Sequence, residues 1–299
     1  MKLIEVNNTN YRFVKDFKHN QEIRASFNEL TQAVFQFDLE KWYSNGYWND
    51  NYIPYSLLHK NKVISNVSVN KMEFIIENER KVAVQIGTVM THKEYRHQGL
   101  SKFIMEEVIN EWKEQSDFIY LFANDSVLDF YPKFNFEITD QYQYSKELST
   151  SKTQNSSLKK LNIDAKFDRE LFLSIVNDTS PISKVSMQNN TSLIMFYCLS
   201  YKKNSIYYLE KLNTAIIMDI EDDTLYLSDV FSKERVQLND VIQRITDETI
   251  KRVILGFTPF DETDYERSLL KTGDTLFVIK DMANYFKNNK WSFPVLSHA

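Results

Sequence analysis

The sequence predicts an α+β protein with mixed sheets, arranged as two domains. Strand-like and helix-like segments alternate along all 299 residues, and a chain of that length commonly holds two domains. The segment Leu148–Leu158 reads LSTSKTQNSSL, lacks an apolar period and is typical of a linker. The order of elements before this segment partly repeats after it. We therefore predict a first domain at 1–148, a linker at 149–157 and a second, smaller domain at 158–299.

The elements of the first domain are predicted from apolar spacing. Phe27, Leu30 and Val34 recur at three-to-four spacing, which favours a helix. Apolar and β-branched runs bounded by polar turns favour strands. In chain order we expect a strand at Lys2–Val6, a helix at Glu22–Phe37, an aromatic loop or short helix at Lys41–Pro54, strands at Tyr55–His59, Val63–Ile76 and Val82–Thr91, a helix over Leu100–Trp112, a strand at Phe118–Ala123, a short helix at Ser126–Phe130 and one or two strands at Phe134–Lys146.

The second domain is expected to follow a similar plan. The likeness lies in the order of elements, since the two halves share no convincing residue identity. We expect strands at Leu158–Asp164, Thr191–Leu199, Ser205–Leu209, Thr214–Ile220, Thr224–Leu227, Val253–Phe257 and Thr275–Asp281, with helices at Asp168–Val176 and Gln237–Thr246.

Composition disfavours several classes of partner. The net charge is -5, from 36 basic and 41 acidic residues, whereas polyanion-binding domains usually carry surplus Lys and Arg. No run approaches the length of a membrane span, and the N-terminus has no signal-peptide pattern. The single cysteine, Cys198, lies in an apolar run and is read as a buried thiol in a reducing compartment. We expect a cytoplasmic protein that binds neither nucleic acid nor membrane.

The most informative segment is Ile86–Met105, which reads IGTVMTHKEYRHQGLSKFIM. A strand runs through a polar turn into a helix whose Leu100, Ile104 and Val108 share one face. Gly99 stands at the helix start, where backbone N–H groups have no partner within the helix. Such donors, with the positive end of the helix dipole, suit a phosphate or diphosphate. A plain strand-to-helix turn explains the spacing equally well, because one glycine in a loop is a weak signal.

Two motifs in this half carry a resemblance to a known family. Arg96–Ser101 (RHQGLS) resembles the Arg/Gln-x-x-Gly-x-Gly/Ala signature of the GNAT superfamily of N-acetyltransferases. Asn124–Phe136 (NDSVLDFYPKFNF) is similar to its second hallmark, Asn-x₆-Tyr followed by Gly-Phe. The motifs stand in the family's order, and the resemblance covers Met1–Leu148. Ser101 replaces Gly or Ala and Asn135 replaces Gly; serine is small, and asparagine tolerates positive φ.

The resemblance implies a GNAT fold in the N-terminal half, a degenerate GNAT-like domain in the C-terminal half, and acetyl-CoA as acyl donor. In the family, two central strands splay apart and the pantetheine arm lies between them. Backbone groups of Val89 and Thr91 would then bond the pantetheine amides, and N–H groups across Arg96–Ser101 would hold the diphosphate. Asn124 would also contact the cofactor, although a turn-forming role is an equally simple reading. The predicted cofactor-binding residues are Val89, Met90, Thr91, Arg96, His97, Gln98, Gly99, Leu100, Ser101 and Asn124.

The resemblance also implies direct attack of a neutral amine on the thioester carbonyl. That reaction needs a route for the amine's proton, donors for the oxyanion and a proton for the thiolate. The resemblance assigns the backbone N–H near Met90 to the oxyanion and Tyr131 to the thiolate. Many members use a strand glutamate as base, but Val82–Gly87 contains no carboxylate. Tandem-domain relatives of the enhanced intracellular survival type, which acetylate aminoglycosides, use the chain's terminal carboxylate. Ala299, or His298 beside it, is therefore the predicted base; the alternative is a tail that only packs on the second domain.

The expected partners are a coenzyme A thioester and an amine acceptor, either a small molecule or a protein. Aromatics of Trp42–Tyr55 could receive an amphipathic amine by cation–π contact, although core packing explains these rings equally well. No metal is expected, because His92 and His97 lack a supporting ligand cluster. Phe231–Val236 contains no glycine, so we predict one cofactor per chain. The alternative function is a non-catalytic acyl-CoA-binding or sensing protein.

Overall fold

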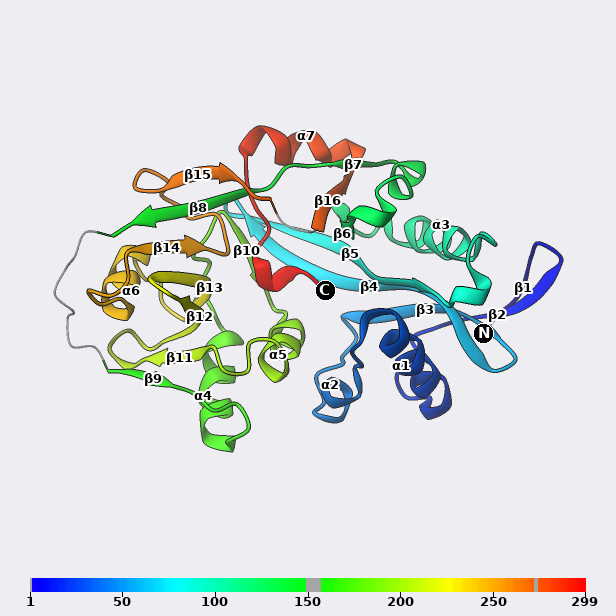
Figure 1. Cartoon of the computed structure of the whole chain (residues 1–299), viewed down its shortest axis with the longest axis horizontal. Coiled ribbons are helices and arrows are strands. Elements are labelled where there is room, and N and C mark those ends of the chain that lie inside the picture. The colour runs from blue at the N-terminus through cyan, green and yellow to red at the C-terminus, as the bar shows by residue number, and fades with distance from the viewer. Residues whose placement is uncertain (1, 149–156, 272–273) are drawn as a thin grey trace.

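Two mixed β-sheets, each flanked by helices, make up the protein (Figure 1). The computed structural model describes residues 2–148, 157–271 and 274–299. Each sheet contains one parallel pair of strands among antiparallel ones. The predicted α+β class with mixed sheets is therefore confirmed.

The first sheet is built mainly from the first half of the chain. Its strands lie in the order β1 (Lys2–Val6), β2 (Thr9–Lys15), β3 (Tyr52–His59), β4 (Lys62–Ile76), β5 (Glu79–Thr91), β6 (Phe118–Asn124), β16 (Asp274–Ile279) and β7 (Phe136–Ile138), with β10 (Val185–Gln188) paired to the far end of β4.

Helices cover both faces of this sheet. Helix α3 (Leu100–Trp112) packs in one apolar cluster with Ile64, whereas α1 (Gln21–Phe35) packs in another with Val63. Neighbouring residues of a strand point to opposite faces, so the two helices lie on opposite sides of the sheet. The shorter elements of this half are α2 (Glu40–Ser44) and the 3₁₀ helices η1 (Lys93–Tyr95), η2 (Asp125–Val127) and η3 (Tyr131–Phe134).

The second sheet lies on the other side of the molecule (Figure 1). Its strands follow the order β15 (Glu266–Leu269), β8 (Tyr142–Glu147), β14 (Arg252–Leu255), β13 (Thr224–Ser232), β12 (Thr214–Glu221), β11 (Ile206–Leu209) and β9 (Leu158–Lys160). The remaining helices are α4 (Lys166–Val176), α5 (Thr191–Leu199), α6 (Leu238–Ile245), α7 (Lys280–Asn289) and the 3₁₀ helices η4 (Glu210–Leu212) and η5 (Val295–Ser297).

The two sheets exchange strands. β8 precedes the predicted linker but pairs with β14 and β15 of the second sheet. β16, close to the end of the chain, lies between β6 and β7 of the first sheet. Of the predicted linker, 149–156 lies outside the described residues. Because of the exchange, neither half of the chain completes its sheet from its own residues.

One predicted element has the wrong type. Thr191–Leu199 was expected to be a strand, but it forms helix α5. The run is apolar on nearly all sides because the helix is buried, so neither helical nor strand periodicity is visible in it. The capping residue was the overlooked signal: the Asn190 side chain accepts a hydrogen bond from the Leu193 N–H, at 3.2 Å. Although α5 is apolar, no helix within the described ranges is long and apolar enough to cross a membrane.

Asparagine supplies many of the left-handed backbone positions. The chain has only five glycines. Asn7 and Asn8, both at positive φ, close the hairpin between β1 and β2, a pairing that the sequence did not predict. Asn135 has a φ of 68° and ends η3 where the family motif has glycine. This substitution therefore leaves the turn intact.

Candidate functional site

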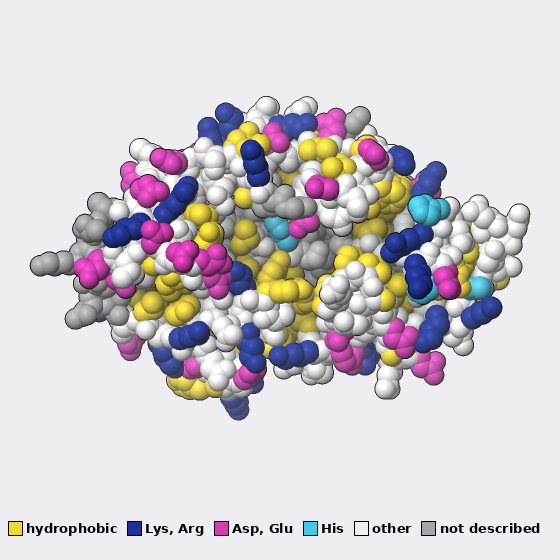
Figure 2. Space-filling view, viewed as in Figure 1, with side chains coloured by type: hydrophobic (Ala, Val, Ile, Leu, Met, Phe, Trp, Pro, Cys, Tyr) yellow, Lys and Arg dark blue, Asp and Glu magenta, His cyan; other side chains and the backbone are white. Residues whose placement is uncertain are grey.

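A cavity of about 780 Å³ lies where the two halves of the molecule meet. The end of α1, strands β5 and β6, the turn before α3, helix α5 and the C-terminus of the chain all contribute to its walls. Figure 1 places the C-terminus at the centre of the molecule, and Figure 2 shows a hollow there with hydrophobic side chains on its walls.

A bulge in β5 shapes the floor of this cavity. The pairing with β4 shifts register so that Thr88 and Val89 oppose the single residue Val67. Thr88 has a φ of 47°, which is costly for a β-branched residue and persists only where surrounding contacts impose it. The Asn66 Nδ2 donates to the Thr88 carbonyl at 2.9 Å, and the Tyr52 hydroxyl bonds the Thr88 Oγ1 at 3.0 Å. The bulge is thus held by buried polar side chains.

Beyond the bulge, β5 and β6 separate. Their parallel pairing covers Ala83–Ile86 and Phe118–Leu121 and then stops, although β5 continues to Thr91 and β6 to Asn124. From Gly87 onward, β5 keeps its hydrogen-bonded pairing with β4, but no pairing with β6 continues. The facing edge of β5 can therefore accept an added strand-like ligand.

The start of α3 borders the same cavity. Its N-cap is Gly99, with a φ of 77°, and no side chain caps the helix. The first N–H groups of α3 are consequently available to an anion. Thr91 Oγ1 and Ser101 Oγ lie 2.6 Å apart and tie the end of β5 to the first turn of α3. Arg96 donates from Nε to the Thr91 carbonyl at 3.2 Å, which holds the exposed guanidinium over the turn.

Tyr131 lies at the cavity wall, in η3. The side chain is only 5% exposed, and its ring packs 5.5 Å from that of Phe277 in β16. Burial raises the pKa of Tyr131 to about 12, so its hydroxyl keeps its proton at neutral pH. Within the described part of the chain the hydroxyl has no recorded hydrogen-bond partner, so its proton can be donated to a ligand in the cavity.

The C-terminus reaches the point where β5 and β6 separate. A Cβ added to Gly87 would lie 2.6 Å from the carbonyl oxygen of Ala299, so the tail packs directly on the strand. Two contacts hold the tail. The His298 imidazole stacks on the Phe122 ring with the ring centroids 3.6 Å apart, and the Tyr197 hydroxyl donates a hydrogen bond to the His298 carbonyl. His298 and Ala299 are therefore held in place at this point of the cavity wall.

Polar atoms with free bonding capacity cluster at this end of the cavity. Asn70 Nδ2, Gln85 Oε1 and His298 Nε2 are buried and have no hydrogen-bond partner among the described residues. Asn70 and Gln85 oppose each other across β4 and β5, and Asn70 Nδ2 is 3.5 Å from the Cβ position of Gly87. Unpaired buried polar atoms are uncommon and mark places where a ligand or a water completes the bonding.

The two candidate bases differ in their surroundings. Burial lowers the pKa of His298 to about 3, so its imidazole is neutral and a weak base at physiological pH. Ala299 is exposed to the cavity and carries the terminal carboxylate. Of the two, the carboxylate is better placed to take a proton from a ligand.

Most of the sequence-predicted residues lie around this one cavity. Its lining includes Val89, Met90, Thr91, Arg96, His97, Ser101, Asn124, Tyr131 and Ala299. Gln98, Gly99 and Leu100 do not border it; Leu100 points into the core, and Gln98 contacts the N-terminal hairpin. The Asn124 side chain accepts from the Ser126 N–H at 3.1 Å, so it forms a turn as well as lining the cavity.

The aromatics predicted as an acceptor pocket lie elsewhere. Trp42, Trp48 and Tyr52 are each about 5% exposed or less and form part of the core beneath α1. Core packing, the second of the two readings of this segment, accounts for these three rings. The sequence did not single out Gly87, whose isolated position within a strand signals a close backbone approach.

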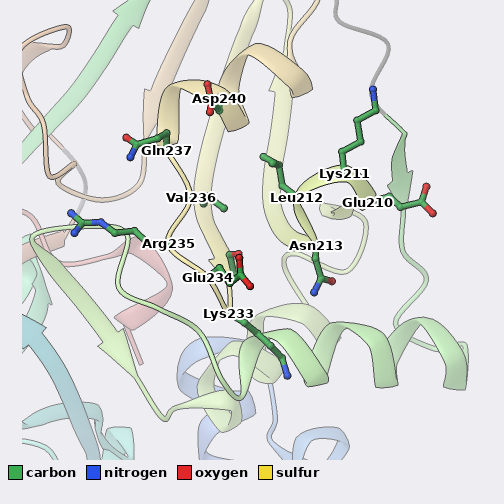
Figure 3. A pocket seen from close by; sticks show the side chains of 11 residues that line it. Glu210, Lys211, Leu212, Asn213, Lys233, Glu234, Arg235, Val236, Gln237 and Asp240 are labelled. Carbon is green, nitrogen blue, oxygen red and sulfur yellow. The ribbon is translucent and has the colours of Figure 1, made fainter.

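The second half has a separate cavity of about 500 Å³ where β13 leads into α6. Its lining contains the acids Glu210, Glu234 and Asp240 beside the bases Lys211, Lys233 and Arg235. Figure 3 shows the three basic side chains pointing away from one another rather than toward a common centre. A diphosphate needs converging donors, so this cavity is poorly suited to coenzyme A. Among the described residues, no group of three or more His, Cys, Asp or Glu side chains is placed to hold a metal ion.

Comparison with known proteins agrees with this geometry. Residues 16–139 match the model of the acetyltransferase (GNAT) domain, and no curated protein matches the chain. The fold is similar to that of a probable N-acyltransferase from Enterococcus faecalis V583, at 13% identity and a TM-score of 0.59, over 93% of this chain and 75% of that one. It is similar to a GCN5-related N-acetyltransferase from Kribbella flavida (12%, 0.56, 93% and 73%) and to Eis1 from Mycobacterium abscessus (9%, 0.55, 91% and 75%).

The fold and the family model agree on the class of the first half: residues 16–139 match a GNAT acetyltransferase domain. Together with the second sheet, the whole chain has the same fold as the solved structures that it resembles over more than nine-tenths of its length.

Proposed function

We propose that this protein is an N-acetyltransferase that moves the acetyl group of acetyl-CoA to a primary amine of a small molecule or a protein. The observation that carries the proposal is the separation of β5 from β6, with the start of α3 at one end of the opening and the terminal carboxylate at the other. A ligand bound at both ends of this opening would have its thioester next to the carboxylate.

The residues fit coenzyme A by the kind of group each offers. The edge of β5 at Val89 and Thr91, which does not pair with β6, suits the amides of the pantetheine arm, because strand addition needs only backbone donors and acceptors. The uncapped N–H groups at the start of α3, with Arg96, suit the diphosphate. Bound there, acetyl-CoA supplies an acetyl group activated as a thioester.

Three groups of the chain would serve the transfer. The Ala299 carboxylate takes a proton from the incoming ammonium, so that the nitrogen can attack. The backbone N–H near Met90, beside the bulge, stabilises negative charge on the carbonyl oxygen. Tyr131, whose pKa of about 12 keeps it protonated, donates its proton to the departing sulfur.

Acetyl transfer is tested with acetyl-CoA, a panel of primary amines and a thiol-reactive dye. We expect thiol release that requires both protein and amine. Tyr131→Phe removes only the hydroxyl and should lower kcat about tenfold or more, with acetyl-CoA affinity unchanged, because the sulfur leaves without its proton donor. Tyr226→Phe in β13 of the second sheet is the matched control.

Calorimetry supplies the second readout. We expect one coenzyme A per chain; two would contradict the single site. Acetyl-CoA binding with no thiol release for any amine would instead favour the sensing protein and reject the acetyltransferase.

Gly87→Ala tests the terminal carboxylate without touching the tail sequence. The new methyl group would overlap the Ala299 carbonyl oxygen at 2.6 Å, so the tail must shift. We expect kcat to fall about tenfold, because a base displaced by an ångström is poorly aligned, while acetyl-CoA affinity changes less than about twofold. Ala299→Gly keeps the carboxylate and should leave both values unchanged. Equal losses in kcat and in acetyl-CoA affinity would speak against the assignment.

A further inference from the structure

Five aromatic side chains form a continuous wall along one side of the cavity. This aromatic wall consists of Phe35, Phe37, Phe196, Tyr197 and Tyr201. Gln36, with a φ of 64°, ends α1 and lets the Phe35 and Phe37 rings stack 6.0 Å apart. The ring centroids of Phe37 and Phe196 lie 6.0 Å apart. The Tyr201 centroid lies 6.1 Å from that of Phe196 and 6.4 Å from that of Tyr197. The wall therefore joins α1 of the first half to α5 of the second.

The wall is open to the cavity rather than buried in the core. Phe35 is 39% exposed and Tyr201 is 64% exposed, whereas rings in the core beneath α1 are almost fully covered. Exposed apolar patches on the surface of a concave site mark the place where an apolar ligand is bound. The cavity thus offers an aromatic surface much larger than an acetyl group.

The same wall leads directly to the terminal carboxylate. The Tyr197 hydroxyl donates a hydrogen bond to the His298 carbonyl, one residue before Ala299. Burial, followed by the neighbouring Tyr201 and the charge of Asp274, raises the pKa of Tyr197 above its usual range. Asp274 lines the same cavity. An amine lying on the wall would share its cavity with both carboxylates and would lie beside the C-terminal tail.

The charges around the cavity are few. Among the described lining residues, the acidic groups are Asp274 and the Ala299 carboxylate, and Arg96 stands at the α3 end. One ammonium group is well matched to these carboxylates and to the faces of the rings. A polyamine or an aminoglycoside would bring several more ammonium groups onto apolar surface, where burial without partners is costly.

We propose that the acceptor is a monoamine with a flat aromatic or alkyl body, of the 2-arylethylamine type, bound along the aromatic wall. This inference rests on the proposed acetyl transfer. The amine nitrogen forms a bond to the thioester carbonyl carbon and the carbon–sulfur bond breaks. The ammonium loses one proton to solvent through the Ala299 carboxylate before the attack. As the carbon–sulfur bond breaks, Tyr131 gives its proton to the sulfur, and a second proton leaving the nitrogen restores the Tyr131 hydroxyl. The products are an amide, a free thiol and one proton in solvent.

Acceptor preference is measured with the full-length protein at saturating acetyl-CoA. The panel is 2-phenylethylamine, hexylamine, spermidine, kanamycin and a lysine-containing peptide. We expect kcat/KM for 2-phenylethylamine to exceed that for spermidine and kanamycin by about tenfold or more. Tyr201→Ala and Phe37→Ala should each lower kcat/KM for 2-phenylethylamine about three- to tenfold, through KM, because each removes ring contact with the body of the amine.

Control and binding measurements separate this inference from the proposed function. Phe167→Ala, at an α4 ring that is 74% exposed and does not border the cavity, should change nothing. A preference for polycations or for the peptide, or insensitivity to both wall variants, overturns the monoamine assignment while acetyl transfer stands. If no amine is acetylated, 2-phenylethylamine is titrated into the protein saturated with coenzyme A. If the protein binds 2-phenylethylamine and Tyr201→Ala weakens that binding, the aromatic wall is a monoamine site although the transferase proposal fails. If 2-phenylethylamine does not bind, the proposal of a monoamine site is overturned as well.

Discussion

Deleting His298 and Ala299 is expected to lower turnover by about a hundredfold or more while leaving acetyl-CoA affinity almost unchanged. General-base catalysis contributes roughly 10²–10⁴ to a rate, and the terminal carboxylate is the candidate base placed against Gly87. The residues that would hold the cofactor lie on β5 and at the start of α3, outside the deleted segment. Steady-state kinetics and calorimetric titration on the same preparation separate the two effects.

Two matched forms of the C-terminus distinguish charge from packing. A chain ending in the carboxamide of Ala299 keeps every atom position but loses the negative charge, and it should be nearly as slow as the deletion. A chain extended by one glycine moves the carboxylate away from Gly87 and should also be slow. The idea fails if the carboxamide form keeps full turnover, because packing of the tail would then be its only role.

The features of the site that the sequence predicted are local ones. The β5–turn–α3 segment was found because Gly99 and the apolar stripe of α3 lie next to each other in the chain. Tyr131 and Asn124 were found through a motif only eight residues long, counting both ends. Such patterns report short-range backbone geometry, which neighbouring residues decide.

The remaining features depend on contacts between distant segments. Phe37 and Phe196 meet across the two halves, and nothing in the spacing of either segment indicates this contact. The terminal carboxylate was predicted only through the family resemblance, because an apolar tail can dock at many places on a sheet. The sequence predicted a strand close to the observed bounds of β16. Its place in the first sheet depends on pairing with β6 and β7, which are far away in the chain, and the spacing of apolar residues does not predict that pairing.

This dependence on β16 leads to the second large effect. A chain that ends at Leu270 is expected to lose cooperative folding and acetyl-CoA binding. β16 pairs with β6 through five residues and with β7 through three, so its removal opens the sheet in its interior. Leu276, Phe277 and Val278 are each 2% exposed or less. Burial of such side chains contributes about 1.5–3 kcal/mol each, against a typical net stability of roughly 5–15 kcal/mol.

Thermal unfolding followed by circular dichroism measures this loss, and the chain lacking only His298 and Ala299 is the control that should still unfold cooperatively. Phe277→Ala tests the same strand with a smaller change. It should lower the free energy of unfolding by about 3–5 kcal/mol, because it leaves a cavity in the core. It should also lower turnover, because the Phe277 ring packs against Tyr131. A chain ending at Leu270 that unfolds cooperatively within a few degrees of the full chain would mean that the first half closes its sheet without β16. In that case the second half would contribute to the site only through the aromatic wall and the tail, and not through the position of Tyr131.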